Sequence, residues 1–151
     1  QGGTNLPFWF TALLILIFDQ GTKWLIKENM ELYQSIPIIP NIFHLTYIEN
    51  PGAAFGILAN QRIFFIIITF IILAFIYYFY RQLKENQVLL KIALGMVVGG
   101  ALGNLIDRWR SGTVTDFFDF QIWPIFNIAD TAVVVAMLYI SYKVLTTKEE
   151  I

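Results

Sequence analysis

Carboxylates are the side chains of this sequence best suited to chemistry. The 151 residues contain no cysteine and a single histidine, His44, which stands in no zinc-binding spacing. None of the serines lies in a G-x-S-x-G or S-x-x-K pattern, so serine catalysis has little support. The acids remain. Two aspartates brought together can share a proton, so that one acts as general base on water while the other donates to a carbonyl oxygen. That chemistry is peptide hydrolysis without a metal or a cofactor.

Polar residues are spaced so that they gather on single helix faces. Two triplets have i, i+3, i+4 spacing: Asp19, Thr22 and Lys23, and Asn104, Asp107 and Arg108. Asn127 and Asp130 stand at the start of a further apolar segment. Ionisable groups within or beside membrane spans are energetically expensive, so several of them converging at one level indicate a functional polar site.

Each acid also has an ordinary structural explanation. With Asn127 as N-cap, Asp130 would occupy position N3, where a carboxylate caps backbone N–H groups and interacts favourably with the helix dipole. Asp19 and Lys23 could form an interfacial i, i+4 ion pair. Asp107 and Arg108 could form an ordinary helix end, and Asp116 and Asp119, expected in a loop, could simply be solvated. Only the convergence of these groups favours a site over the separate explanations.

The composition identifies the elements that must position these groups. The chain is 57% hydrophobic and 17% aromatic, with 14% charged residues and a mean hydropathy of +0.63, which is typical of a polytopic membrane protein. A net charge of -1 and scattered basic residues argue against nucleic-acid binding. Four apolar segments approach the roughly 20 residues that a membrane-spanning helix needs. They are residues 6–26, 62–80, 89–106 and 127–145.

The segments between the predicted helices differ in character. Residues 27–61 suggest short strands followed by a Pro–Gly turn, and residues 107–126 also read as extended. We expect one integral-membrane domain over 6–151, and we interpret residues 1–5, QGGTN, as a remnant of expression. In the third span, small residues at 95, 99 and 103 would let neighbouring helices approach closely.

Four spans place both termini on one side of the membrane. The short 81–91 turn carries Arg81, Lys84 and Lys91, and Lys143 and Lys148 lie near the C-terminus, so this side is predicted to be cytoplasmic. Five other basic residues fall toward the opposite side and weaken the prediction: Lys23, Lys27, Arg62, Arg108 and Arg110. In this orientation the polar groups and both long connections lie at the outer face.

Five motifs together resemble those of one protein family. They are DQGTK (19–23), ENPGAAFG (49–56), GGALGNLIDR (99–108), VTDFFDF (114–120) and FNIADTA (126–132). The chain closely resembles lipoprotein signal peptidase, the type II signal peptidase of bacteria, over residues 7–145. The resemblance implies a bundle of four transmembrane helices in the bacterial cytoplasmic (inner) membrane. It also implies a small extracytoplasmic β-cradle and a short surface helix, formed from residues 30–61 and 107–124.

The resemblance also implies an activity and a site. The family is one of membrane aspartic endopeptidases that remove the signal peptide of diacylglyceryl-modified prolipoproteins, cleaving immediately before the lipidated cysteine. Its catalytic pair would be Asp116 and Asp130. The supporting or substrate-binding residues would be Asp19, Lys23, Asn50, Gly52, Asn104, Arg108, Asn127 and Ala129. Implied partners are lipid-modified prolipoproteins, membrane lipids and globomycin-type peptide inhibitors, with no cofactor, metal or nucleic acid.

One departure and two alternatives accompany this resemblance. Pro51 follows the motif asparagine and removes a backbone donor, so the conformation of the clamp should differ from that of relatives. A small transporter or channel would also use intramembrane acids, but it needs polar groups along a path across the membrane, and the predicted cytoplasmic half of the spans is nearly apolar. A catalytically silent assembly factor of the same fold is the other alternative, against which the intact aspartates argue.

Overall fold

Four long helices make up most of the protein. The computed structural model describes residues 4–146, so residues 1–3 of the predicted N-terminal remnant and residues 147–151, including Lys148, lie outside the described residues. The helices are α1 (Leu6–Asn29), α2 (Arg62–Tyr80), α3 (Val88–Ser111) and α4 (Ile128–Thr146). Each is long and apolar enough to cross a membrane. The prediction of four membrane-spanning helices is therefore confirmed.

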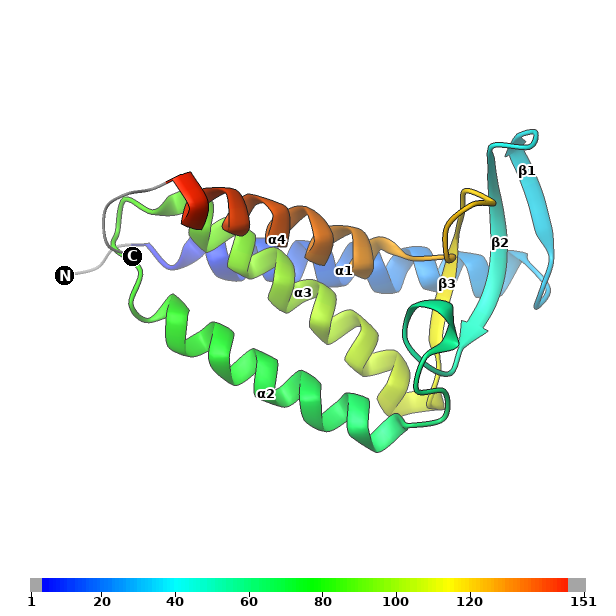
Figure 1. The fold of residues 1–151 in the computed structure, drawn as a ribbon, viewed down its shortest axis with the longest axis horizontal. Coiled ribbons are helices and arrows are strands. Elements are labelled where there is room, and N and C mark those ends of the chain that lie inside the picture. The colour runs from blue at the N-terminus through cyan, green and yellow to red at the C-terminus, as the bar shows by residue number, and fades with distance from the viewer. Residues whose placement is uncertain (1–3, 147–151) are drawn as a thin grey trace.

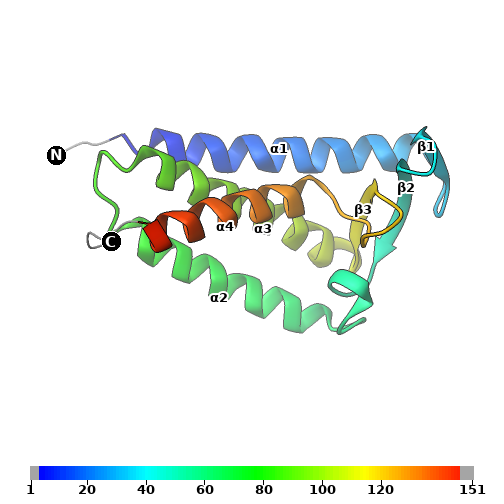
Figure 2. The ribbon, with the colours of Figure 1, turned by 45° about the horizontal axis from the view of Figure 1, so that its top comes forward.

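Helix α3 lies at the centre of the bundle and contacts the other three helices (Figures 1 and 2). Small residues make this close packing possible. A Cβ atom added at Gly95 or Gly99 would meet a backbone carbonyl oxygen of α1 at 2.5 Å, and one added at Gly100 would meet the Ala129 oxygen of α4 at 2.6 Å. The predicted small-residue face therefore joins α3 to α1, and Gly100 extends the same device to α4.

A three-stranded antiparallel sheet caps one end of the bundle (Figure 1). Its order is β1 (Ser35–Ile39), β2 (Phe43–Asn50) and β3 (Val114–Asp119). The register between β2 and β3 shifts between Leu45 and Ile48, so β2 carries one extra residue there. A one-turn 3₁₀ helix, η1 (Ala54–Gly56), follows β2. The predicted strands and the small cradle are confirmed.

Several helix boundaries differ from the sequence prediction, and α1, for example, ends at Asn29 rather than at 26. Helix α3 continues five residues beyond the predicted end at 106 and stops at Ser111, where Gly112 takes a left-handed conformation with φ 80°. Glycine adopts this conformation at little cost, which suits it to end a helix. Lys91, which the sequence prediction placed both in the basic turn 81–91 and in the span 89–106, belongs to the first turn of α3 and is buried.

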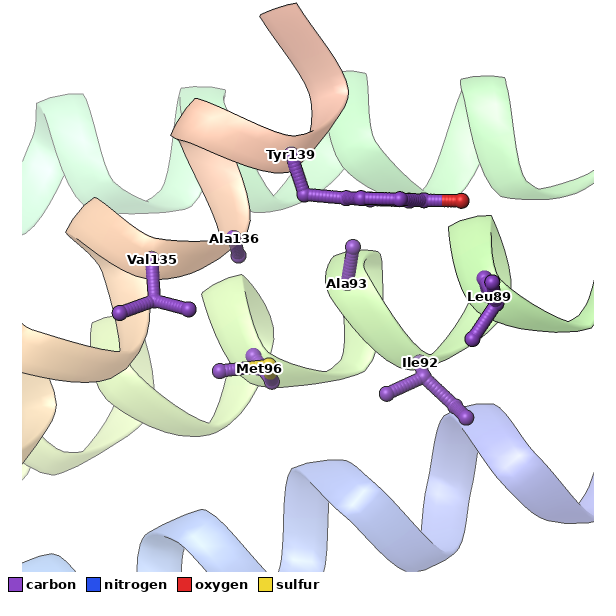
Figure 3. A pocket seen from close by; sticks show the side chains of 7 residues that line it. All are labelled: Leu89, Ile92, Ala93, Met96, Val135, Ala136 and Tyr139. Carbon is purple, nitrogen blue, oxygen red and sulfur yellow. The ribbon is translucent and has the colours of Figure 1, made fainter. Parts of the chain in front are cut away.

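An apolar groove of about 220 Å³ lies between α3 and α4, away from the sheet (Figure 3). Seven side chains line it: Leu89, Ile92, Ala93, Met96, Val135, Ala136 and Tyr139. The Tyr139 ring covers one side, and its hydroxyl is the only polar side-chain group among these residues (Figure 3). Such a lining suits hydrocarbon rather than chemistry, so the polar groups at the sheet end of the bundle are the ones to consider.

Candidate active site

Asp116 lies in the middle of β3, opposite Ile48 of β2. Only 2% of its surface is exposed. The Asn50 side chain donates a hydrogen bond of 3.2 Å to Oδ2, and the Asn127 side chain donates one of 2.8 Å to Oδ1. Amide groups from β2 and from the start of α4 therefore fix both carboxyl oxygens.

Asp130 lies in the first turn of α4 and forms a reciprocal cap with Asn127. The backbone N–H of Asp130 donates to Asn127 Oδ1 at 2.9 Å, and the backbone N–H of Asn127 donates to Asp130 Oδ2 at 3.2 Å. This is the arrangement of a capping box. The other oxygen, Oδ1, accepts a 2.9 Å bond from the Asn104 side chain of α3. The predicted capping role is confirmed, and it leaves Asp130 beside the other polar groups.

Asn127 joins the two aspartates. It is fully buried, and it bonds Asp116 through its side-chain N–H and Asp130 through both its backbone N–H and its side-chain oxygen. Burial, with the nearby charge of Asp130 as a further cause, raises the pKa of Asp116 to about 7. A carboxyl group whose pKa is raised toward neutral pH is suited to acid–base chemistry.

Lys23 of α1 and Arg108 of α3 are the two cations of the site, and Lys23 is the one at its centre. Its ammonium contacts Asp19 Oδ2 at 2.8 Å, Asp107 Oδ2 at 2.9 Å and Asn104 Oδ1 at 2.9 Å. Three acceptors match the three N–H donors of an ammonium group. Lys23 and Asp19 are 2% and 0% exposed, so both charges are compensated within the protein rather than by water.

The loop after β2 is tied to the same cluster. The Gly52 N–H donates to Asn50 Oδ1 at 2.9 Å, and the Gly52 oxygen accepts a 3.4 Å bond from Arg108. The Arg108 guanidinium also lies 4.4 Å from the centre of the Phe65 ring of α2, which is cation–π geometry. Pro51 thus opens a loop whose next residue is bonded on both of its backbone polar groups.

The structure brings all ten predicted site residues into one continuous hydrogen-bonded network. Its remaining link is the Ala129 N–H, which donates to Asp19 Oδ1 at 3.0 Å. Thr22, which shares a helix face with Asp19 and Lys23, instead bonds backbone oxygens of its own helix. The site residues implied by the resemblance left out Asp107 and Gln20, although Asp107 has i+3 spacing from Asn104 and Gln20 lies within the DQGTK motif.

Asp119 and His44 belong to a separate polar chain on the sheet. Asp119 Oδ2 accepts a bond from the Thr46 hydroxyl at 2.7 Å, Thr46 contacts Ser35, and Ser35 contacts His44 Nδ1 at 3.0 Å. No hydrogen bond links this chain to Asp116 or Asp130 within residues 4–146. In the same part of the chain, no three His, Cys, Asp or Glu side chains are grouped so that they could hold a metal ion.

Comparisons with known proteins agree in sequence and in fold. Residues 11–146 match the family described as Signal peptidase (SPase) II. The chain is 46% identical over 140 residues to a lipoprotein signal peptidase of Moorella thermoacetica, with 93% of each chain covered. It is 45% identical over 142 residues to that of Bacillus subtilis, covering 91% of this chain and 92% of the other. A solved structure described as a bacterial membrane enzyme superimposes with a TM-score of 0.85 at 37% identity, covering 94% of this chain and 92% of the other.

Proposed function

The chain belongs to the signal peptidase II family, and on that premise we propose that it is an aspartic endopeptidase acting on lipid-modified prolipoproteins. Its substrates would be diacylglyceryl-modified precursors, cleaved immediately before the lipidated cysteine. Asp116 and Asp130 would form the catalytic pair within a single integral-membrane peptidase domain over residues 6–151. The observation that carries this proposal is the buried Asn127, which bonds both aspartates at the end of the membrane bundle.

The proposed reaction uses one proton shared by the two carboxyl groups. The ionised carboxylate takes a proton from a water molecule, whose oxygen attacks the scissile carbonyl carbon, while the protonated carboxyl donates to the carbonyl oxygen. Collapse of the tetrahedral intermediate breaks the C–N bond, and the leaving nitrogen takes a proton from the pair. Burial favours such sharing, because two adjacent negative charges are costly away from water.

The position of the pair suits a lipid-anchored substrate. Asp130 lies one turn inside α4 and Asp116 lies in the sheet beyond the helices, so both are at one end of the span (Figure 1). A lipid-anchored precursor presents its cleavage site at the same level, because the acyl chains hold the adjacent cysteine at the membrane surface. Membrane lipids and globomycin-type peptides are proposed as further ligands of this region.

The proposed location is the bacterial cytoplasmic membrane, with the sheet outside and the ends of the bundle formed by the start of α1 and the end of α4 in the cytoplasm. These two helix ends lie at the same end of the bundle, away from the sheet (Figures 1 and 2). The exposed residues Arg81 and Lys84 in the α2–α3 turn support this orientation.

Cleavage of matched precursors tests the proposal. Purified protein in detergent should cleave a diacylglyceryl-modified precursor and leave the same precursor without lipid intact. The product should begin with the lipidated cysteine, as mass spectrometry would establish. Equal cleavage of both precursors, or cleavage at another bond, would contradict the proposed substrate class.

A further inference from the structure

Two buried carboxylates outside the proposed pair bond the backbone next to it in the same way. Asp107 Oδ2 accepts a 3.1 Å bond from the N–H of Thr115, the residue before Asp116. Asp19 Oδ1 accepts a 3.0 Å bond from the N–H of Ala129, the residue before Asp130. Within residues 4–146 no hydrogen bond joins Asp107 or Asp19 directly to either aspartate of the pair. Both act one peptide away.

We propose that Asp107 and Asp19 are positioning residues that set the separation of Asp116 and Asp130 by holding the preceding peptide groups. The inference rests on the proposed function, because it presumes that these two aspartates react. Lys23 sets the distance between the Asp19 and Asp107 carboxylates, since its ammonium contacts them at 2.8 and 2.9 Å. The positions of β3 and α4 therefore both depend on the position of one cation, Lys23 of α1.

The backbone of Thr115 is held on both sides by helix side chains. Its N–H bonds Asp107 of α3, and its oxygen accepts a 3.2 Å bond from the Asn127 side chain. Neither group faces β2, and Thr115 is fully buried. These two bonds therefore satisfy the backbone groups of Thr115 that no neighbouring strand pairs with. They also fix the position of the adjacent Asp116 relative to the helices.

Gln20 and Gly103 in turn fix the positions of the Asp107 and Asp19 side chains. The Gln20 side-chain N–H lies within 3.0 Å of Asp107 Oδ1 and 3.2 Å of Asp19 Oδ2, and 3.1 Å from the Gly103 oxygen. Gly103 also provides space, because a Cβ atom there would overlap the Asp19 carboxylate. Fixed acceptors of this kind are what precise placement needs, since a shift of about 1 Å in reacting groups can cost about 100-fold in rate.

Asp107 and Asp19 use their carboxyl oxygens differently, and this difference allows a specific test. Asp107 uses one oxygen, Oδ2, for both Thr115 and Lys23, so the amide oxygen of Asp107→Asn can serve both, and the bond from Gln20 to Oδ1 is lost with asparagine and leucine alike. Asp19 uses Oδ1 for Ala129 and Oδ2 for Lys23, so Asp19→Asn must lose one of them. Leucine at either position has the same number and branching of side-chain heavy atoms and no acceptor, and it removes the same charge as asparagine.

The four variants should separate positioning from charge. We expect kcat on lipidated precursor to fall less than about 10-fold for Asp107→Asn and about 100-fold for Asp107→Leu, with KM unchanged within about threefold. For Asp19→Asn and Asp19→Leu, kcat should fall about 100-fold in both cases. Because asparagine and leucine remove the same charge, the pH dependence of kcat should be the same within each pair. Equal kcat for Asp107→Asn and Asp107→Leu would overturn the proposal, as would a loss that lies in KM.

Gln20→Met provides a test if the leucine variants do not fold. This change removes the amide and leaves every buried charge in place, so it should lower kcat about three- to tenfold without changing KM. Unchanged kcat in this variant would then refute positioning by this network. Asp116→Asn and Asp130→Asn are measured beside it: if they retain turnover, the proposed function fails, whereas if they lose it and the other results disagree, only the positioning inference fails.

Discussion

Asp130 would combine two roles in one side chain, a structural cap and the proposed reactive acid. One carboxyl oxygen caps the start of α4 through the Asn127 N–H, and the other faces Asn104. A cap and a reactive acid are compatible because a carboxylate has about four acceptor positions, of which these contacts use only two. The capping explanation and the catalytic one therefore do not compete, although either alone would account for an acid at this position.

Replacing the proposed acids one at a time should separate chemistry from structure. Asp116→Asn and Asp130→Asn should each lower turnover about 100- to 10,000-fold, because each removes a group needed for proton transfer. Asp130→Asn should still fold, since asparagine keeps an acceptor for the cap and loses only the bond from Asn104 and about 0.3–1 kcal/mol of helix-dipole stabilisation.

Asp119→Asn is the matched control for these variants. Asp119 bonds Thr46 and the Gln121 N–H, outside the network around the aspartate pair. Its turnover should stay within about threefold of the original protein, because no proton transfer is assigned to it. Near-normal turnover in a folded Asp116→Asn or Asp130→Asn protein would disprove the catalytic assignment.

Stability should depend on pH through Asp116. Burial, with Asp130 as a second cause, raises its pKa from 3.8 to about 7. Between these pH values the folded protein binds more protons at this carboxyl than the unfolded chain does, so its contribution to the free energy of unfolding decreases as pH rises from about 4 to about 7 and is constant above. Asp116→Asn has no such group, so its melting temperature in detergent should fall less across that window. The same change of melting temperature with pH in the original protein and in Asp116→Asn would contradict the raised pKa.

Chelation should leave activity intact. The proposed reaction uses carboxyl groups as acid and base, and the described residues offer no metal-binding group of three or more His, Cys, Asp or Glu side chains. Turnover measured after dialysis against EDTA should equal that of an untreated sample. If chelation abolished turnover and one divalent ion restored it, the aspartates would be metal ligands rather than an acid–base pair.

At the scale of secondary structure, α3 determines how closely the other helices approach. Gly99 contacts α1, and Gly100 contacts α4 at Ala129, the residue before Asp130. Packing and site geometry therefore meet at adjacent positions of one helix. A side chain at Gly99 would separate α1 from α3 and so disturb the contacts of Lys23 with Asp107 and Asn104 of α3.

Gly99→Ala should destabilise the bundle. Its Cβ atom would lie 2.5 Å from the Ala12 oxygen and 2.8 Å from Ile15 Cβ, so the helices must move apart at a cost of about 1–3 kcal/mol. Gly21→Ala in α1 is the control, because nothing lies within 4 Å of its added Cβ atom. The melting temperature in detergent should fall for Gly99→Ala and stay the same or rise for Gly21→Ala. The same melting temperature for both would show that close packing is unimportant here.

Helix positions followed from the sequence more readily than helix ends and partners did. Hydropathy located four spans within a few residues because membrane-spanning helices must be apolar. It stopped α3 at 106 because the last turn is polar, while the helix ends at Gly112, whose backbone conformation hydropathy does not report. The bulge in β2 was also unpredictable, since pairing register depends on contacts between distant segments.

The candidate site was predictable as a set of residues but not as a set of bonds. Spacing placed Asp19 with Lys23 and Asn104 with Asp107 on shared helix faces. It did not indicate that Asp107 and Asp19 accept backbone N–H groups of β3 and α4, because those partners are peptide groups that every residue has. Backbone partners become visible only when the elements are assembled.

At the scale of the whole molecule, polar and apolar regions occupy different parts. The exposed side chains of α2 are mostly large and apolar, as suits contact with lipid, including Phe70, Phe75 and Tyr78. The charged network lies at the sheet end. A path of polar groups across the bundle would suit transport, whereas a cluster confined to one end suits surface chemistry.

Orientation can be measured with single-cysteine labelling, because the chain has no cysteine of its own. A cysteine in the 83–88 turn should react with a membrane-impermeant thiol reagent only after cells are opened, since the turn is predicted to be cytoplasmic. A cysteine at Asn60 should react in intact cells. The reverse pattern of labelling would place the sheet in the cytoplasm.

The network around Lys23 also bears on how the protein is made. Its members come from α1, from α3 and from the start of α4, which is the last of the four spans to be synthesised. Until α4 reaches the membrane, Asp19 has no Ala129 N–H to bind and Asp116 has no Asn127. A nascent chain with only three spans inserted therefore lacks both Asp130 and Asn127, one of the two amides that bond Asp116. The protein would be inert during its own synthesis, and activity would begin only when the last helix is in place.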